Sequence, residues 1–216
     1  AYRVATALRG IQSGAMLERR PPTPGSPTAF ADGSEADDVP SGALQPSVGI
    51  RDWLLGEGAR MPNAEEMLAG LAERLIAIGV PVDRASTAID TLHSEYAGVG
   101  RIWTRDGGTS VRLFPHGARS TDAYLNSPFH TVHETGEWLI LDLSETPDDA
   151  YAIIPDLKAG GYTHYVVAPL FFTNGTKNGI TFATRAPEGF GEDDIAILRF
   201  VMPALAAVAE MRVLNK

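Results

Sequence analysis

The residues best suited to chemistry stand together in one short segment, His130-Thr131-Val132-His133-Glu134. Two imidazoles and a carboxylate so close in sequence could bind a divalent metal ion. In the zinc-protease pattern, however, the histidines stand four residues apart on a helix with the glutamate between them, whereas here they stand three apart with the glutamate outside. Solvated residues of a loop or short helix are the favoured interpretation. A stand-alone metal-dependent hydrolase that uses His130, His133 and Glu134 is the alternative.

Other reactive groups are absent or form no recognisable pattern. The chain of 216 residues has no cysteine, which excludes Cys nucleophiles, thiolate metal sites and disulfides. It has no Gly-x-Ser-x-Gly turn and no glycine-rich phosphate loop ahead of a helix. We therefore predict no catalytic residue and no cofactor.

Charge and hydropathy exclude two classes of partner. The net charge is -9, from 18 basic and 27 acidic side chains, which argues against binding to the phosphate backbone of nucleic acids. No apolar run reaches the roughly 18 residues of a membrane-spanning helix, so no membrane partner is expected. The start of the sequence lacks the basic and apolar regions of a secretory signal, and the cytoplasm is the expected location.

The chain divides into two parts by composition. Residues 1–50 are rich in Pro, Gly and Ser and are predicted to be an extension or linker, with a short helix at about residues 2–17 that Arg20-Pro21-Pro22 ends. Residues 51–216 carry the periodic apolar patterns of a folded domain.

Helices and strands alternate along residues 51–216. Asn63 with Glu66 predicts a helix start, apolar residues recur to Ile78, and Gly79 ends the helix. Strands are predicted at 85–93, 100–105, 109–114, 137–143, 164–172 and 178–185, with a loop over 115–135 and a hairpin at Asn174-Gly175. A final apolar helix runs to Leu214, and Pro203 should bend it or start a new segment. This order predicts an α+β fold in which helices pack on an antiparallel sheet.

One face of the last strand carries only small residues, Gly179, Thr181 and Ala183. Small residues let a helix approach closely or leave space for a ligand. Close packing is the favoured interpretation.

Several features follow in one order along the C-terminal half: the strand Tyr165-Val166-Val167-Ala168-Pro169-Leu170, the turn Asn174-Gly175, the strand 178–184, the pair Gly189-Phe190 and the apolar helix from Ile195. Together they resemble the C-terminal half of a GAF domain. Trp53-Leu54, the helix that ends at Gly79, Thr91-Leu92-His93, Ile102-Trp103 and the segment 161–165 further resemble the N-terminal regulatory region of alphaproteobacterial class III adenylate/guanylate cyclases.

The resemblance implies a sensor fold of the PAS/GAF type. Its antiparallel sheet would have five or six strands, with the N- and C-terminal helices on one face and a small-molecule pocket over the other. The candidates for lining this pocket are His93, Trp103, Phe129, Trp138, Tyr165 and Thr181. The implied function is small-molecule sensing and dimerisation that controls a cyclase in cAMP signalling. A ligand-free GAF-like dimer scaffold is a further alternative.

Departures from the cyclase pattern limit what this chain does by itself. Class III catalysis needs two metal-binding aspartates on neighbouring strands with Arg and Asn partners, and no such set is found. The resemblance therefore implies that the chain is not an enzyme and that the catalytic domain lies outside it. The cyclic-nucleotide signature of GAF domains is also missing, and the lack of cysteine excludes a thiol-linked bilin.

The final helix carries an apolar stripe of Leu198, Met202, Leu205 and Ala209. We predict that this stripe forms a homodimer and transmits a signal toward the catalytic partner. The alternative is that it covers the chain's own sheet.

Overall fold

The computed structural model describes residues 41–91 and 94–215. All of them belong to the second of two compact units, Asp38–Lys216. The predicted short helix at residues 2–17 and His93 lie outside the described residues. The boundary predicted at residue 50 differs from the structure, because helix α1 (Ser41–Leu55) begins within the predicted linker and contains Pro46.

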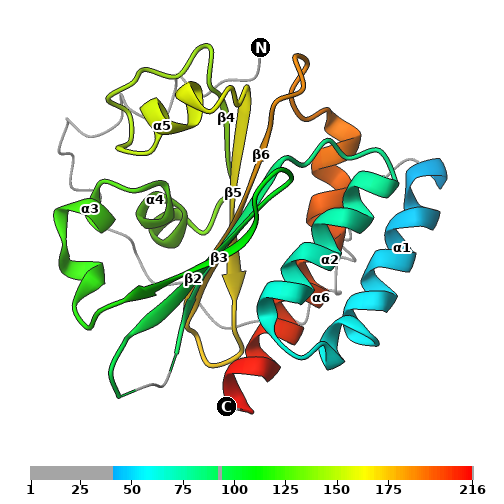
Figure 1. The fold of residues 1–216 in the computed structure, drawn as a ribbon, viewed down its shortest axis with the longest axis horizontal. Helices are drawn as coiled ribbons and strands as arrows, with labels where there is room; N and C mark the ends of the chain where they lie inside the picture. The colour runs from blue at the N-terminus through cyan, green and yellow to red at the C-terminus, as the bar shows by residue number, and fades with distance from the viewer. Residues whose placement is uncertain (1–40, 92–93, 216) are drawn as a thin grey trace, which may run out of the picture. The chain divides into compact units, whose positions relative to one another are not determined.

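A six-stranded antiparallel sheet forms the centre of the fold, in the order β3-β2-β1-β6-β5-β4 (Figure 1). Its strands are β1 (Arg84–Asp90), β2 (Gly98–Thr104), β3 (Gly108–Phe114), β4 (Leu139–Asp142), β5 (His164–Phe171) and β6 (Lys177–Thr184). All six predicted strands are present, and β4 is shorter than predicted. The central pair joins distant parts of the chain, since Ala88 of β1 lies opposite Gly179 of β6.

Helices cover both faces of the sheet. On one face lie α1, α2 (Ala64–Ala77) and α6 (Glu192–Leu214), and on the other lie α3 (Asp122–Leu125), α4 (Pro128–Thr135) and α5 (Ile154–Ala159) (Figure 1). Short 3-10 turns, η1 (Gly58–Arg60) and η2 (Ala118–Ser120), precede α2 and α3. The prediction that α2 and the last helix share one face, as part of an α+β fold, is confirmed.

Local signals fix several element ends. The Asn63 side chain accepts a hydrogen bond from the Glu66 amide at 2.7 Å and donates to the Glu66 carboxylate at 2.8 Å, so the predicted capping box starts α2. Gly79, at φ +99°, ends it, because few other residues adopt this conformation. Gly175, at φ +81°, turns the chain between β5 and β6, which confirms the predicted hairpin. Pro203 lies inside α6, which continues through it without a new segment.

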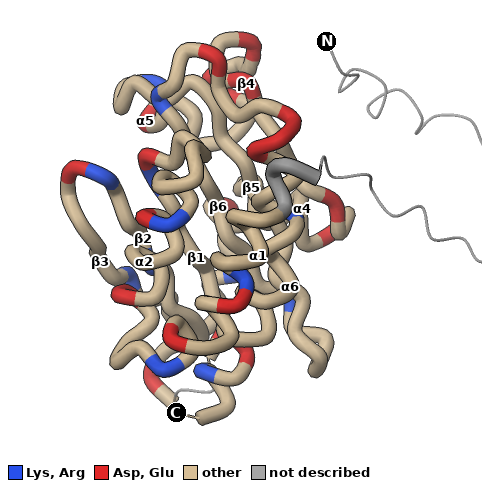
Figure 2. The backbone as a smooth tube through the Cα atoms, turned by 90° about the vertical axis from the view of Figure 1, so that its right-hand side faces the viewer, with Lys and Arg blue, Asp and Glu red and all other residues tan. Residues whose placement is uncertain are grey.

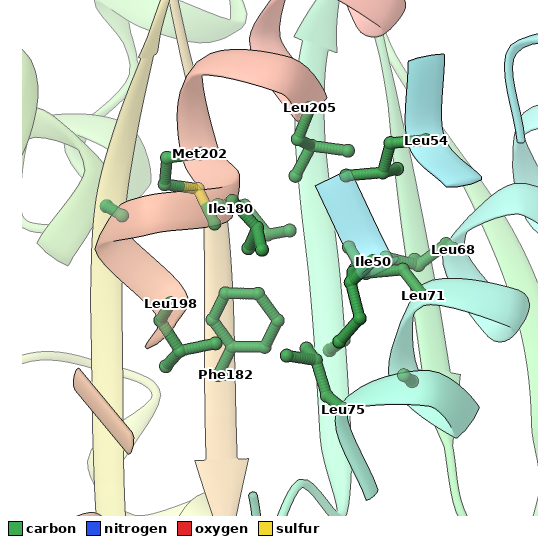
Figure 3. Close-up of a cluster of buried hydrophobic side chains, with 14 of the residues drawn as sticks. Ile50, Leu54, Leu68, Leu71, Leu75, Ile180, Phe182, Leu198, Met202 and Leu205 are labelled. Carbon is green, nitrogen blue, oxygen red and sulfur yellow. The ribbon is translucent and has the colours of Figure 1, made fainter. Parts of the chain in front are cut away.

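The larger core fills the space between the sheet and α1, α2 and α6. Figure 3 shows Phe182 of β6 between Leu198 of α6 and Leu75 of α2. A smaller core lies on the other face and includes Tyr165, Val132 and Leu157. The two cores are separated by the sheet, so a residue's face decides which of them it can join.

The segment predicted as a loop over 115–135 is not a plain loop, because it contains η2, α3 and α4. Thr121 and Ser127 cap the two helices, each accepting a hydrogen bond from a backbone amide three residues later. Pro128 stands in the first turn of α4, where its missing N–H costs no hydrogen bond. The helix α4 lies over β4, β5 and β6, which form one half of the sheet.

Candidate functional site

A row of buried polar side chains crosses the sheet on the face covered by α4. The hydroxyls of Ser86 in β1 and Thr181 in β6 are 2.6 Å apart, and both residues are buried. Tyr165 of β5 is 1% exposed. Burial raises the pKa of Tyr165, while hydrogen bonding to Thr181 and the nearby Arg84 act in the opposite direction. One terminal nitrogen of Arg84 is buried and has no hydrogen-bond partner, so this row holds an unsatisfied donor.

Phe129 closes the site from above. A Cβ atom added to Gly179 would lie 2.5 Å from the Phe129 ring, far inside normal contact distance. The lack of a side chain at Gly179 therefore serves close packing, as predicted. The ring comes from α4, so the position of α4 decides whether the sheet beneath it is covered.

Polar contacts fasten α4 and the segment before it to the ends of β1 and β6. Arg119 forms an ion pair of 2.8 Å with Asp90 and donates to the carbonyl of Lys177. The Lys177 ammonium donates to the carbonyl of His133 at 2.6 Å, and His133 Nδ1 lies 2.8 Å from the Tyr124 hydroxyl. α4 and the segment before it are thus held at this end by an ion pair and by hydrogen bonds of side chains.

Burial is the main reason that the pKa of His133 is lowered. The positive charges of Arg119 and Lys177 lower it further, whereas the backbone of Asn178 and the charge of Asp90 raise it. His133 is 4% exposed. The neutral imidazole is therefore the form that the folded chain favours.

The His130, His133 and Glu134 segment does not form a metal site. His133 is bonded to Tyr124, and Glu134 is exposed on the outer side of α4. Within residues 41–91 and 94–215, no group of three or more His, Asp or Glu side chains could hold a metal ion. The metal-dependent hydrolase is not favoured.

The predicted pocket residues divide between the two faces. Phe129, Tyr165 and Thr181 lie together on the α4 face. Trp103 and Trp138 pack with the larger core, where Arg199 of α6 stacks over the Trp138 ring at 4.6 Å. The prediction that all of these line one pocket is wrong for the two tryptophans, because the sheet separates them from the α4 face.

A groove of about 370 Å³ opens on the opposite face, between the start of α2, the end of α6 and strands β1 and β2. Its lining mixes apolar and polar residues and includes Arg101, which pairs with Glu65 at 2.9 Å. The Arg101 side chain is only 9% exposed, so the Glu65 carboxylate neutralises a guanidinium charge that is largely shielded from water. No described pocket candidate lines this groove.

The apolar stripe of α6 faces inward. Leu198, Met202, Leu205 and Ala209 are 0%, 7%, 1% and 8% exposed, and all four belong to the larger core. The prediction that these side chains meet a second copy is corrected, since they cover the chain's own sheet. The outward side of α6 presents Arg199, Pro203 and Ala207.

Basic and acidic residues are interspersed along the backbone tube in the view of Figure 2. Among the described helices, none is both long and apolar enough to cross a membrane.

Solved structures with this arrangement exist. A GAF domain of a two-component sensor histidine kinase from Bacillus halodurans has 16% sequence identity and a TM-score of 0.51, with 69% of this chain and 96% of that chain covered. A GAF domain of a phosphoenolpyruvate-protein phosphotransferase from Coxiella burnetii has 20% identity and a TM-score of 0.51, over 80% and 95%. The phycocyanobilin-bound GAF domain of a cyanobacterial phytochrome has 16% identity and a TM-score of 0.52, over 78% and 96%.

The chain has a GAF-like fold. At these identities the likeness concerns the fold alone, and it agrees with the expected sheet of five or six strands and the helical layer. The sequence matches no protein-family model and no curated protein.

Sequence reasoning missed two parts of the GAF-like domain's site. The sequence pattern does not single out Arg84 and Ser86, which lie on one face of β1. The contact of Phe129 with Gly179 was also missed, because it joins residues 50 positions apart. Two adjacent polar residues, Ser86-Thr87, give no alternation that would mark Ser86 in the sequence, and the contact of Phe129 with Gly179 depends on the fold.

Proposed function

We propose that this GAF-like domain is a regulatory module that binds a small molecule on the α4 face. The observation that carries the proposal is the Phe129 ring, which lies on Gly179 beside a buried polar row whose Arg84 has an unpartnered nitrogen. Gly179 lies opposite Ala88, four residues along β1 from Arg84. A ligand that takes the place of the ring and extends along β1 as far as Arg84 would gain the apolar contact and satisfy that donor. Because Arg84 is cationic, the ligand would be a planar molecule with a carboxylate or another acceptor at one edge.

One solved GAF domain of similar fold, from a cyanobacterial phytochrome, is phycocyanobilin-bound. This supports the proposal that a domain of this fold binds a small molecule. This chain has no cysteine, so we propose a ligand bound without a thioether bond.

The output of the domain would pass through α6. Glu210 of α6 accepts hydrogen bonds from the backbone amide of Thr173, in the turn between β5 and β6, at 3.0 and 3.1 Å. Displacement of Phe129 would shift β6 and, through this turn, the end of α6. Such a switch needs a ligand that binds the two arrangements with different affinity, and about 1–3 kcal/mol is a typical coupling.

The controlled partner in this proposal is a class III adenylate/guanylate cyclase domain outside this chain, acting in cAMP signalling in the cytoplasm. Such cyclases work with two catalytic domains side by side, so we propose a homodimer. Its surface would be the outward side of α1 and α6, which includes Gly49, Pro203 and Ala207.

A ligand-free GAF-like dimer scaffold is the second candidate. The close contact of Phe129 with Gly179 and the 1% exposure of Tyr165 favour it, because both describe a site that is already filled.

Thermal stability measured with a panel of planar aromatic carboxylic acids tests the ligand proposal. A ligand at 100 times its Kd adds about 2.7 kcal/mol to the free energy of unfolding. We expect Arg84→Met to remove this gain, and Arg112→Met, which changes an exposed arginine of β3, to leave it unchanged. A gain that persists in Arg84→Met would exclude the α4 face, and no gain with any acid would favour the scaffold.

Activity assays test the regulatory part. The isolated chain should not convert ATP into cyclic AMP. In a full-length host cyclase, Arg84→Met should change the response of cyclase output to the ligand while the Arg112→Met control keeps it. Cyclase activity in the isolated chain, or an unchanged response in Arg84→Met, would contradict the proposal.

A further inference from the structure

Strand β3 forms an open edge of the sheet. Its seven residues pair with β2 in a continuous register, and β3 is the last strand in the order. All but Phe114 are exposed. The backbone N–H and C=O groups on its outer side have no strand partner within the described part of the chain.

This edge lacks the features that usually prevent pairing. Natural edge strands are kept apart by short length, proline, bulges or several charges. β3 is seven residues long, has no proline and no bulge, and carries one charge, Arg112. Val111 and Leu113 are 52% and 56% exposed. The opposite edge, β4, is only four residues long and ends in Asp142.

Val111 and Leu113 lie on the face covered by α2. Val111 is opposite Arg101 in the neighbouring strand, and Arg101 pairs with Glu65 of α2. The exposed side chains of Val111 and Leu113 therefore extend the apolar face under α2 as far as the open edge of the sheet.

We propose that β3 pairs in antiparallel fashion with β3 of a second copy, about a two-fold axis through Val111. In this register Val111 faces Val111 of the second copy, Thr109 faces its Leu113 and Ser110 faces its Arg112. Gly108 and Phe114 form the two ends, so the whole strand is paired.

The neighbouring registers are worse. A shift by two residues in one direction places the two Arg112 side chains opposite each other, which is destabilising. A shift by two in the other direction places Leu113 opposite Gly107, beyond the end of the strand. A shift by one residue would require paired residues to point to different faces. The register centred on Val111 avoids all three problems.

This contact is separate from the proposed helix dimer and goes beyond the proposed function. A two-fold axis perpendicular to the sheet reverses every direction within the sheet plane. The α6 helices of the two copies would therefore run in opposite directions, so this contact would not bring two downstream domains together. It would link regulatory units to one another through a continuous sheet of two sets of six strands.

Cysteine cross-linking tests the register directly, because the chain has no cysteine of its own. Residues that face each other in an antiparallel pair have Cα atoms about 4.5–5.5 Å apart, within the range of a disulfide. We expect Val111→Cys to form a disulfide-linked dimer under mild oxidation at about 100 μM protein. Thr109→Cys lies on the same face, but it faces position 113 of the second copy, four residues away from that copy's position 109. This variant should stay monomeric on a non-reducing gel. A mixture of Thr109→Cys and Leu113→Cys chains should form the mixed dimer.

Charge substitutions provide an independent measurement by sedimentation. Ser110→Glu would face Arg112 twice in the dimer, so we expect the dissociation constant to fall about 2- to 30-fold. Val111→Lys would place two ammonium groups on the axis and should leave only monomers at this contact. Both positions are exposed, and an unchanged thermal midpoint would show that each variant folds.

Three results would overturn the inference: no more cross-linking in Val111→Cys than in Thr109→Cys, no change of association in Ser110→Glu and Val111→Lys, or disulfides formed only with a different protein. Ala207→Cys reports on the outward side of α6. Cross-linking at position 207 without cross-linking at 111 would retain the proposed helix dimer and refute the strand contact, and the reverse would refute the helix dimer alone.

Discussion

Gly179→Ala should displace Phe129 and with it α4. The added Cβ would lie 2.5 Å from one ring atom and 2.6 Å from another, whereas ordinary contacts are 3.4–4 Å, so the ring must retreat by about 1 Å. The backbone at position 179 is held between β1 and β5, and the ring is the part that can move. Overpacking of this kind costs about 1–3 kcal/mol.

Urea and thermal unfolding measure this cost. For a domain of this size we expect the midpoint temperature to fall by about 2–12 °C. Gly49→Ala is the matched control, since Gly49 lies in α1 and nothing lies within 4 Å of an added Cβ. Alanine should stabilise that helix by about 0.5–1 kcal/mol.

A double-mutant cycle with Phe129→Val isolates the contact. The smaller side chain leaves room for the new methyl group, so Gly179→Ala should cost less in the Phe129→Val background than in the parent chain. An equal cost in both backgrounds, or a neutral Gly179→Ala, would refute the packing of Phe129 on Gly179 and the idea that α4 closes the site.

Three further substitutions test other contacts. The lowered pKa of His133 means that the unfolded chain binds a proton more readily, so stability should fall as the pH drops below about 6.5, and His133→Gln should flatten this pH dependence in thermal unfolding. Glu65→Ala leaves Arg101 buried without its partner and should cost about 1–3 kcal/mol in urea unfolding, more than Arg101→Met; equal losses would contradict a role for burial. Glu210→Gln should speed hydrogen exchange at the Thr173 amide, because the amide loses its carboxylate acceptor. In the parent chain this loss of protection should appear only at acidic pH, because hydrogen bonds from Thr173 lower the pKa of Glu210.

Local signals in the sequence were sufficient for most of the secondary structure. Asn63 and Gly79 mark the ends of α2 because capping and positive φ depend on a few neighbouring residues. Asn174-Gly175 fixed a hairpin for the same reason. The sequence predicts a loop or short helix around residues 130–134 and does not decide between them, because a helix of eight residues has too few turns to show a period.

The face of each side chain could not be predicted in the same way. Alternation along a strand shows which residues share a face, but which face receives which helices depends on the path of the whole chain. Trp103 and Tyr165 are both buried aromatics of strands, and they belong to different cores. The apolar stripe that contains Leu205 indicates that one side of α6 is buried. The stripe does not indicate what covers it, since an apolar surface can pack on the chain's own sheet or on a partner.

The pairing of the first described helix with the last has a consequence for synthesis of the chain. α1 packs beside α6, and Arg212 near the end of α6 donates to the carbonyls of Ala59 and Met61, just after α1. The central strands β1 and β6 also pair late in synthesis, because Ala88 of β1 can pair only after Gly179 of β6 has been synthesised. A nascent chain that ends before Glu192 therefore exposes the apolar side chains that α6 later covers. We expect the domain to stay unfolded on the ribosome until α6 has left the exit tunnel, and to need protection from aggregation until then.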